Sequence, residues 1–320
     1  MQELIKNSVV VKEIESGMRL DRLLAAKFPV INRDEWQKRI LNGLVLVDSK
    51  KTKPSRKLNA ADRIDFFYQK KDEPEVNFDV KILYEDDTIL VLDKPANLPV
   101  HPSGIYFKNT LHRYLKEKYG EQFVVRFAHR LDRETSGILI LTKTGSAAAI
   151  VQKSFFNGEI YKEYFVIVEG NFPEYKNAEG ILLRDDKSII RKKRKFIFNE
   201  LPQNYTNAET ARTEFFPEFS LKNISLLRAI LHTGRMHQIR ATLCSMGFPV
   251  VGDRLYGIDE NLYLKLISGE GSKDDLEILK MDRTALHCSI MEFNHPKTGE
   301  RMRIESKLPE DIQTFLREYT

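Results

Sequence analysis

Residues 129–143, HRLDRETSGILILTK, join a charged segment to an apolar one. The aliphatic run at 138–141 follows a Ser-Gly turn and is typical of a buried strand. Asp132 stands just before it, between Arg130 and Arg133. A nearby positive charge lowers the pKa of a carboxyl below its usual value of about 3.9, so we expect Asp132 to stay ionised and to be available as a nucleophile. In an isolated stretch of this kind, the alternative is a surface ion pair.

Strand patterns dominate the sequence from about residue 80 onward. The predicted strands include the apolar runs at 89–92, 138–141, 164–168, 181–183, 196–198, 213–216 and 224–231. Two helices are predicted among them, at 110–119 and 145–156. Strands in hairpin-like succession favour an antiparallel or mixed sheet, so the predicted fold class is α+β.

The first 70 residues differ from the rest of the chain in charge. They carry 15 Lys or Arg against 9 Asp or Glu, whereas the rest carries 36 against 37. A polar, proline-containing stretch follows them, which is typical of a linker. We therefore predict a small basic domain at 1–70, a linker at 71–79 and a large domain at 80–320.

The small domain is predicted to contain two helices and two short strands. The first helix is expected over 18–24, and the second over 33–42 with Asn32 as its N-cap. Short strands are expected at 44–47 and 62–67.

A second polar cluster lies at 231–240, LHTGRMHQIR. The run at 224–231 predicts a strand, and a Thr-Gly turn connects it to a predicted helix over 236–246. This places Arg235 at the junction of strand and helix. Arg240 falls on a different part of the helix, where packing or a phosphate contact is expected.

Together these motifs resemble those of RNA pseudouridine synthases of the RluA branch, which isomerise uridine in RNA to its carbon-linked form. The resemblance rests on 129–137, on 231–240 with the GDRLYG that follows at 252–257, and on ILVLDKPANLPVHP at 89–102. Residues 17–68 resemble an S4 RNA-binding domain. The resemblance implies a central sheet with flanking helices and a reaction that needs no cofactor.

The resemblance also implies roles for four residues. Asp132 is the expected nucleophile, attacking either the ribose or the uracil ring. Arg235 is expected to pair with it. Tyr164 is expected to stack on the target base and, as a bolder alternative, to remove its carbon-bound proton. Arg130 is expected to fill the place that the target nucleotide leaves in the RNA stack.

The motif at 89–102 has one departure from the family pattern. Asn97 stands where a glycine is common, but Asn tolerates positive φ, so we expect the turn to survive. Asp93 and Lys94 could form a second acid/base pair, although fixing this turn is the expected role.

Basic side chains on the small domain's helices are candidates for an RNA-binding face: Arg19, Arg22, Arg33, Lys38 and Arg39. Such charges are sometimes only solvated, but here they coincide with the positive excess of the chain. The run RKKRK at 191–195 is expected to form an exposed hairpin, with contact to the RNA backbone as the alternative.

Composition restricts the remaining possibilities. The two cysteines, Cys244 and Cys288, are far apart and show no metal-ligand spacing, which argues against a zinc-dependent deaminase and for a reducing compartment. No apolar stretch has the length of a membrane span, and the N-terminus lacks a signal peptide's apolar centre. We expect a cytoplasmic monomer without a metal.

Structured ribosomal RNA of the large subunit is the expected substrate, and tRNA is the alternative. A non-catalytic ribosome assembly factor with an S4 domain is the rival from another class. The presence of Asp132, Tyr164 and Arg235 argues against it, because binding alone does not require all three.

Overall fold

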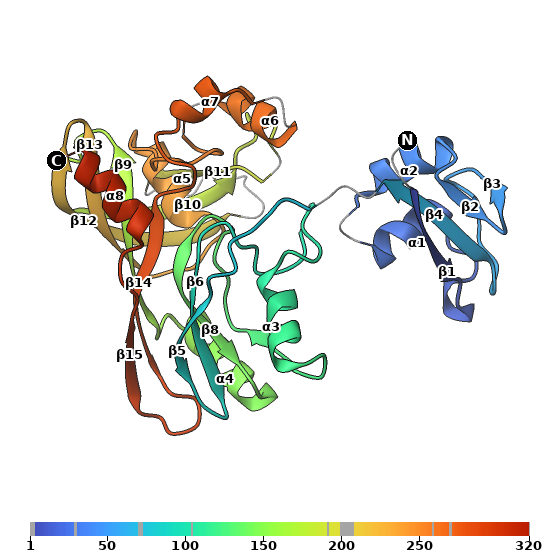
Figure 1. The fold of residues 1–320 in the computed structure, drawn as a ribbon, viewed down its shortest axis with the longest axis horizontal. Coiled ribbons are helices and arrows are strands. Elements are labelled where there is room, and N and C mark those ends of the chain that lie inside the picture. Colours follow the sequence, from blue (N-terminus) through green and yellow to red (C-terminus); the bar gives the residue numbers. More distant parts are fainter. Residues whose placement is uncertain are drawn as a thin grey trace. The chain divides into compact units, whose positions relative to one another are not determined.

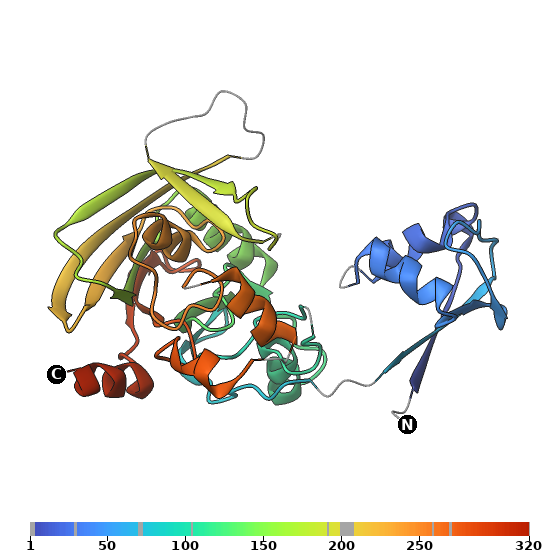
Figure 2. The ribbon, with the colours of Figure 1, turned by 90° about the horizontal axis from the view of Figure 1, so that it is seen from above.

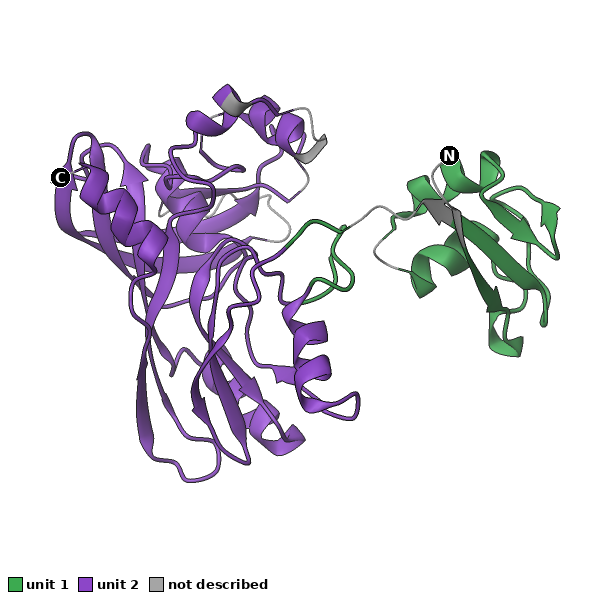
Figure 3. Cartoon of the chain, viewed as in Figure 1, with its two compact units in different colours: residues 1–75, 101–109 green, residues 76–100, 110–320 purple. Residues whose placement is uncertain are grey.

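The computed structural model describes residues 4–28, 31–69, 73–103, 105–190, 192–198, 208–257, 259–268 and 271–319. The chain divides into two compact units, one of residues 1–75 with 101–109 and one of 76–100 with 110–320 (Figure 3). Within the first unit, the Glu73 carboxylate accepts backbone hydrogen bonds from Lys108 and Asn109 at 2.7–2.8 Å. The predicted linker begins among residues 70–72, which lie outside the described part.

The first unit is a four-stranded antiparallel sheet with two α-helices. The strand order is β1 (Leu4–Val10), β4 (Arg63–Gln69), β2 (Val45–Val47) and β3 (Lys50–Lys51). The helices are α1 (Leu20–Lys27) and α2 (Arg33–Leu41), preceded by a short 3-10 helix at Glu13–Glu15. Trp36 and Ile40 from α2 join apolar side chains of α1 and the sheet in a separate hydrophobic core.

The predicted second helix is confirmed together with its cap, since the Asn32 side chain accepts a hydrogen bond from the Glu35 N–H at 2.8 Å. The first helix begins at Leu20, two residues later than predicted, and β1 was not predicted. Both differences concern short segments in which pairing with distant residues decides the structure.

The second unit is built on an eleven-stranded mixed sheet (Figure 1). Its main strand order is β11, β10, β12, β13, β9, β14, β8, β6 and β5, with β15 beside β14 and β7 beside β8. The strands are β5 (Lys81–Glu85), β6 (Ile89–Lys94), β7 (Arg126–Phe127), β8 (Ser136–Thr142), β9 (Tyr161–Glu169), β10 (Lys176–Arg184), β11 (Arg194–Phe198), β12 (Glu209–Leu221), β13 (Ile224–Leu231), β14 (Leu286–Asn294) and β15 (Arg301–Glu305).

Among the described residues, six helices accompany this sheet: α3 (Leu111–Tyr119), α4 (Gly145–Phe156), α5 (Gln238–Ser245), α6 (Glu260–Ser268), α7 (Lys273–Glu277) and α8 (Glu310–Tyr319). Figure 2 shows α5 against the face of β10 and β11, which it also contacts. The α+β class and every predicted apolar strand are confirmed. Helices α6 to α8 and strands β5, β7, β14 and β15 were not predicted. No helix of the described residues has the length and hydropathy needed to span a membrane.

The centre of the sheet brings the motifs together. Strand β9 lies between β13 and β14, and β14 pairs in parallel with β8 through Cys288 and Gly137. Gly137 has a φ of 111°, and a Cβ there would lie 2.2 Å from the Cys288 carbonyl oxygen. Only glycine permits this approach, which sets the start of β8 beside β14, the strand on which Cys288 lies opposite Tyr164 of β9.

Candidate active site

A cavity of about 590 Å³ lies in the second unit and is lined by three segments of the chain together with Leu286 of β14. They are residues of 128–135 before β8, of 155–164 from the end of α4 into β9, and of 231–240 from β13 into α5. Two of the motifs that carried the resemblance, 129–137 and 231–240, therefore meet around one cavity, and Asp132 and Tyr164 both line it.

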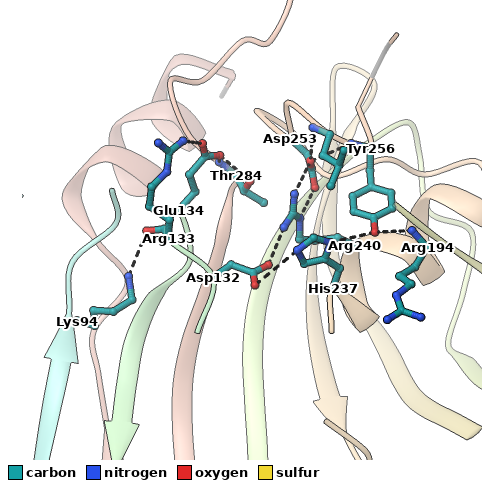
Figure 4. Close-up of polar contacts among 11 residues, drawn as sticks. Lys94, Asp132, Arg133, Glu134, Arg194, His237, Arg240, Asp253, Tyr256 and Thr284 are labelled. Atoms are coloured by element: carbon teal, nitrogen blue, oxygen red, sulfur yellow. Dashed lines mark hydrogen bonds and ion pairs between the residues drawn. The ribbon is translucent and has the colours of Figure 1, made fainter. Parts of the chain in front are cut away.

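One carboxylate oxygen of Asp132 accepts a hydrogen bond from Arg240, and the other lies near His237 without a hydrogen bond from the part of the chain that the structure describes (Figure 4). Its Oδ2 accepts a hydrogen bond from Nη1 of Arg240 at 2.6 Å. Its Oδ1 lies 3.9 Å from Nε2 of His237 and accepts no hydrogen bond from the described residues. Burial tends to raise the pKa of this carboxyl, but the charge and hydrogen bond of Arg240 outweigh that effect and hold the pKa below its usual value. Asp132 is therefore ionised at neutral pH, as expected.

Arg240 is itself fixed by a second carboxylate. Its Nε and Nη2 donate to Asp253 at 2.6 and 2.9 Å, and its guanidinium lies 5.1 Å from the centre of the Tyr256 ring. Asp253 is buried and also accepts the backbone N–H groups of Leu255 and Tyr256 at 2.9 and 3.0 Å. The GDRLYG segment thus anchors the arginine that orients Asp132.

The expected pairing of Arg235 with Asp132 is wrong. Arg235 is exposed at the cavity wall, and its Nε donates to the Thr210 carbonyl at 3.1 Å. The reason is local: α5 begins at Gln238, after His237 has taken a left-handed φ of 57°, so Arg235 stays in the turn. Arg240 lies in the first turn of α5 and is directed inward.

Burial of α5 explains why Arg240 is paired with carboxylates. Every residue from Gln238 to Leu243 is buried, so this helix has no solvent-facing side near Arg240. An arginine in a helix that is buried all round must be paired with a carboxylate. The buried carboxylate that pairs with Arg240 through two hydrogen bonds is Asp253.

Tyr164 projects from β9 and is 6% exposed. Cys288 on β14 lies opposite Tyr164 in the sheet. Burial raises the pKa of this phenol well above its usual value, and the nearby Asp132 charge adds to the effect. His237 is the other titratable neighbour, and burial lowers its pKa to about 4, so it is neutral at pH 7.

Lys94 joins the turn after β6 to the loop that carries Asp132. It is fully buried, and its Nζ donates to the carbonyls of Pro95, Leu98 and Arg133 at 2.8, 3.1 and 3.2 Å (Figure 4). The expected role of Lys94 in fixing this turn is confirmed. Asn97 has a φ of 57°, so the turn survives without glycine, as expected.

Three of the five candidate basic residues of the first unit are paired with carboxylates. Arg19 and Arg33 donate to the buried Asp21 carboxylate, at 3.0 Å through Nε and 2.8 Å through Nη2 respectively, although their side chains are 36% and 43% exposed. Arg39 pairs with Glu35 at 3.0 Å. These three arginines therefore have carboxylate partners within the first unit, and the prediction that they contact RNA stays a prediction.

Arg22 and Lys38 are exposed and have no carboxylate partner among the described residues. They remain candidates for contact with RNA. Arg130 is also exposed, and it lines the cavity of the second unit.

The basic run at 191–195 is a hairpin connection but is not fully exposed. Arg191 lies outside the described residues. Lys193 pairs with Glu260 at 2.9 Å, and Arg194 on β11 lies 3.8 Å from Glu209. Only Lys192 is exposed among the described members of this run. No group of three or more His, Cys, Asp or Glu in the described chain could hold a metal ion.

Substituting the two arginines separately tests which of them supports Asp132. Arg240→Leu leaves Asp253 and Asp132 without their cation and is expected to lower the free energy of unfolding by about 3 to 5 kcal/mol. Arg235→Leu, the matched control, removes an exposed side chain and is expected to change it by about 0.5 kcal/mol at most. Urea unfolding of both variants measures the difference; a larger loss in Arg235→Leu would contradict the pairing described above.

Comparison with known proteins identifies the family. The family model for RNA pseudouridylate synthases matches residues 88–245, and that for the S4 domain matches 18–64. An uncharacterized RNA pseudouridine synthase of Chlorobaculum parvum is 31% identical over 317 residues, which cover 96% of this chain and 95% of the relative. Ribosomal large subunit pseudouridine synthase D of Yersinia pestis is 32% identical over 323 residues, covering 98% and 94%. A solved structure of human RNA pseudouridylate synthase domain containing 1 shares the fold, with a TM-score of 0.56, 20% identity and coverage of 77% of this chain and 97% of that one. This chain therefore belongs to the RluA family of RNA pseudouridine synthases and carries an N-terminal S4 domain.

Proposed function

We propose that this protein converts uridine to pseudouridine in large-subunit ribosomal RNA, with Asp132 as the nucleophile and the target nucleotide flipped into the cavity. The observation that carries the proposal is the state of Asp132. One oxygen is fixed by Arg240 at 2.6 Å, while the other has no hydrogen bond from the described residues. An ionised carboxylate held in this way presents a free oxygen to the substrate in a fixed direction.

The reaction exchanges one bond to the ribose for another. The bond from C1′ to N1 of uracil breaks, the base turns within the cavity, and a bond from C1′ to C5 forms. N1 gains a proton and C5 loses one, so the atoms balance and nothing is oxidised. Attack of Asp132 on C1′ and attack on the uracil ring both start from the same free oxygen.

Burial of the site supports base flipping. The Asp132 side chain is 25% exposed, which is too little for contact with a base that stays stacked in an RNA helix. Arg130 is exposed and lines the cavity. A planar guanidinium both stacks and donates hydrogen bonds, which suits Arg130 to the position that the target base vacates.

Tyr164 is suited first to stack on the uracil and then to remove its C5 proton. Its ring forms part of the cavity wall, where it can stack on uracil. In the free enzyme its pKa is raised by burial and by the Asp132 charge, which keeps the hydroxyl protonated. Bonding of Asp132 to the substrate removes that charge and so lessens the rise in the pKa of Tyr164, whose larger cause, burial, remains. This order favours removal of the C5 proton by Tyr164 only after the nucleophile has been used.

The ribosomal substrate is inferred from relatives and from the first unit. Several relatives, including the one from Yersinia pestis, are named ribosomal large subunit pseudouridine synthase D. The S4 domain adds a unit with exposed basic side chains, as binding of structured RNA requires. A tRNA substrate is the alternative that the following experiment distinguishes.

The substrate and the nucleophile are tested together by mapping pseudouridines in a strain that lacks the gene. Sites in large-subunit ribosomal RNA are expected to disappear and to return when the wild-type gene is restored. Asp132→Asn keeps the shape of the side chain but loses the nucleophile, so it is expected to fold normally and restore none of them. Loss of sites in tRNA alone would refute the ribosomal assignment, and a tenth of wild-type rate in the Asn variant would remove Asp132 from the mechanism.

Tyr164→Phe keeps the ring and removes the hydroxyl. We expect the rate of pseudouridine formation to fall by a factor of about 100 or more, within the range that general base catalysis contributes, while RNA binding is retained. Single-turnover kinetics and filter binding on the same RNA separate the two effects. Near-normal turnover would reduce Tyr164 to a stacking role and leave the proton to another group, such as neutral His237.

The two exposed basic residues of the first unit are tested by the salt dependence of binding. Each phosphate contact contributes about 0.7 to 0.9 to the slope of log affinity against log salt, so Arg22→Gln with Lys38→Gln is expected to make the slope shallower by up to about 1.8. Arg19→Gln is the comparison, because its side chain is tied to Asp21; its expected effect is lower stability of the first unit. An unchanged slope in the double variant would mean that these charges are only solvated.

A further inference from the structure

Lys162 is a buried cation in the wall of the cavity. It lies on β9, two residues before Tyr164 and therefore on the same face of the strand, and it is 4% exposed. Its Nζ lies 5.8 Å from the centre of the Phe155 ring. Its charge has no carboxylate partner and no hydrogen bond to a carbonyl among the described residues.

Lys94, another buried lysine near the site, does have hydrogen-bond acceptors. The Nζ of Lys94 is buried equally deeply, but three backbone carbonyls accept its hydrogen bonds. Around Lys162 the charged or titratable neighbours are His129 before β8, Cys288 on β14 and Arg235 before α5. None of these is an anion at neutral pH, because burial lowers the pKa of His129 to about 3 and raises that of Cys288 to about 12.

An unpaired buried ammonium lowers the stability of the fold. Its presence in the wall of a binding cavity therefore points to a ligand that supplies the missing partner. Burial lowers the pKa of Lys162 to about 8, so the charged form still predominates at neutral pH. The missing partner must be negatively charged or a strong hydrogen-bond acceptor, and it must come from the substrate.

We propose that Lys162 binds a backbone phosphate of the RNA beside the target nucleotide. Phosphate is the one group of RNA that is always an anion, whereas uracil is neutral until its bond to the ribose breaks. Arg240 is not available to bind this phosphate, because its guanidinium is already hydrogen-bonded to Asp132 and Asp253.

The position of Lys162 agrees with a phosphate ligand. Its Nζ lies beside Phe155 and near Gly234, where an added Cβ would be 3.9 Å away. These two residues belong to the 155–158 and 231–235 segments, which include the exposed residues Phe156 and Arg235 at the rim of the cavity. A flipped nucleotide leaves its phosphates towards the rim while its base goes deeper.

The test rests on the proposed function and uses the full chain in the inactive Asp132→Asn form, so that binding is measured without turnover. The probe is a synthetic RNA hairpin that contains a uridine mapped as above, either unmodified or with one neutral methylphosphonate in place of a phosphate next to that uridine. Adding Lys162→Met is expected to weaken binding of the unmodified hairpin about 10- to 100-fold. Lys307→Met, which removes an exposed lysine, is the matched control and is expected to change binding less than twofold.

The decisive comparison is between the variants and the modified hairpins. At one linkage, the methylphosphonate is expected to weaken binding to the Lys162 protein as much as Lys162→Met does, and to have no further effect on the Met variant. Equal losses with both proteins at every linkage would overturn the proposal. Unchanged binding with slow turnover when Lys162→Met is made in the active enzyme would also overturn it, because the charge would then act on the departing uracil.

Two measurements distinguish loss of the phosphate contact from unfolding of the variant and from failure of the proposed function. Lys162→Met is expected to unfold at a temperature equal to or above that of the parent, since it removes an unpaired buried charge. If the wild-type chain forms no pseudouridine in the hairpin, the proposed function fails; if it does and the two proteins respond alike to methylphosphonates, only the phosphate contact fails.

Discussion

The geometry of the active site depends on one guanidinium shared by two carboxylates. Arg240 gives two of its N–H groups to Asp253 and one to Asp132. Asp253 is in turn fixed by two backbone N–H groups, so the order of constraint runs from the backbone through Asp253 and Arg240 to Asp132. Arg240 makes two hydrogen bonds to Asp253 but only one to Asp132. A carboxylate that accepted hydrogen bonds at both oxygens would have no oxygen free to attack the substrate.

This arrangement also links stability to pH. Both carboxyls have pKa values in the folded protein below their usual values, because Arg240 outweighs the opposing effect of burial. Their contribution to stability is present at neutral pH and is lost as the pH falls through those lowered values. The charges that prepare Asp132 for attack therefore also hold the loop before β8 against α5.

The sequence predicted local structure well and distant pairing poorly. Strand β13 was predicted over 224–231, and the cap at Asn32 was recognised, because both depend on neighbours in the chain. The partner of Asp132 was misplaced by five residues, because the start of α5 is set by a left-handed residue at His237. Arg240 and Asp132 are 108 residues apart, and no periodic pattern relates them.

In the first unit too, partners that are distant in sequence could not be predicted. Arg19 and Arg33 are charged residues on short helices, and in sequence they look like Arg22 and Lys38. They differ only because the buried Asp21 lies between them in space, accepting a bond from each and from Gln37 at 2.7 Å. Burial of one acidic side chain divides the basic residues into structural and exposed ones, and only the tertiary structure reveals the division.

The late position of β14 in the chain has a consequence for how the protein is made. This strand fills the place between β8 and β9, which end at Thr142 and Glu169, yet it begins only at Leu286. Until the ribosome has synthesised it, the facing edges of β8 and β9 lack their pairing partner and can associate with other chains. The first unit has its own core and can fold well before that. The nascent protein thus depends on rapid completion of its C-terminal third, and slow translation there would favour aggregation over folding.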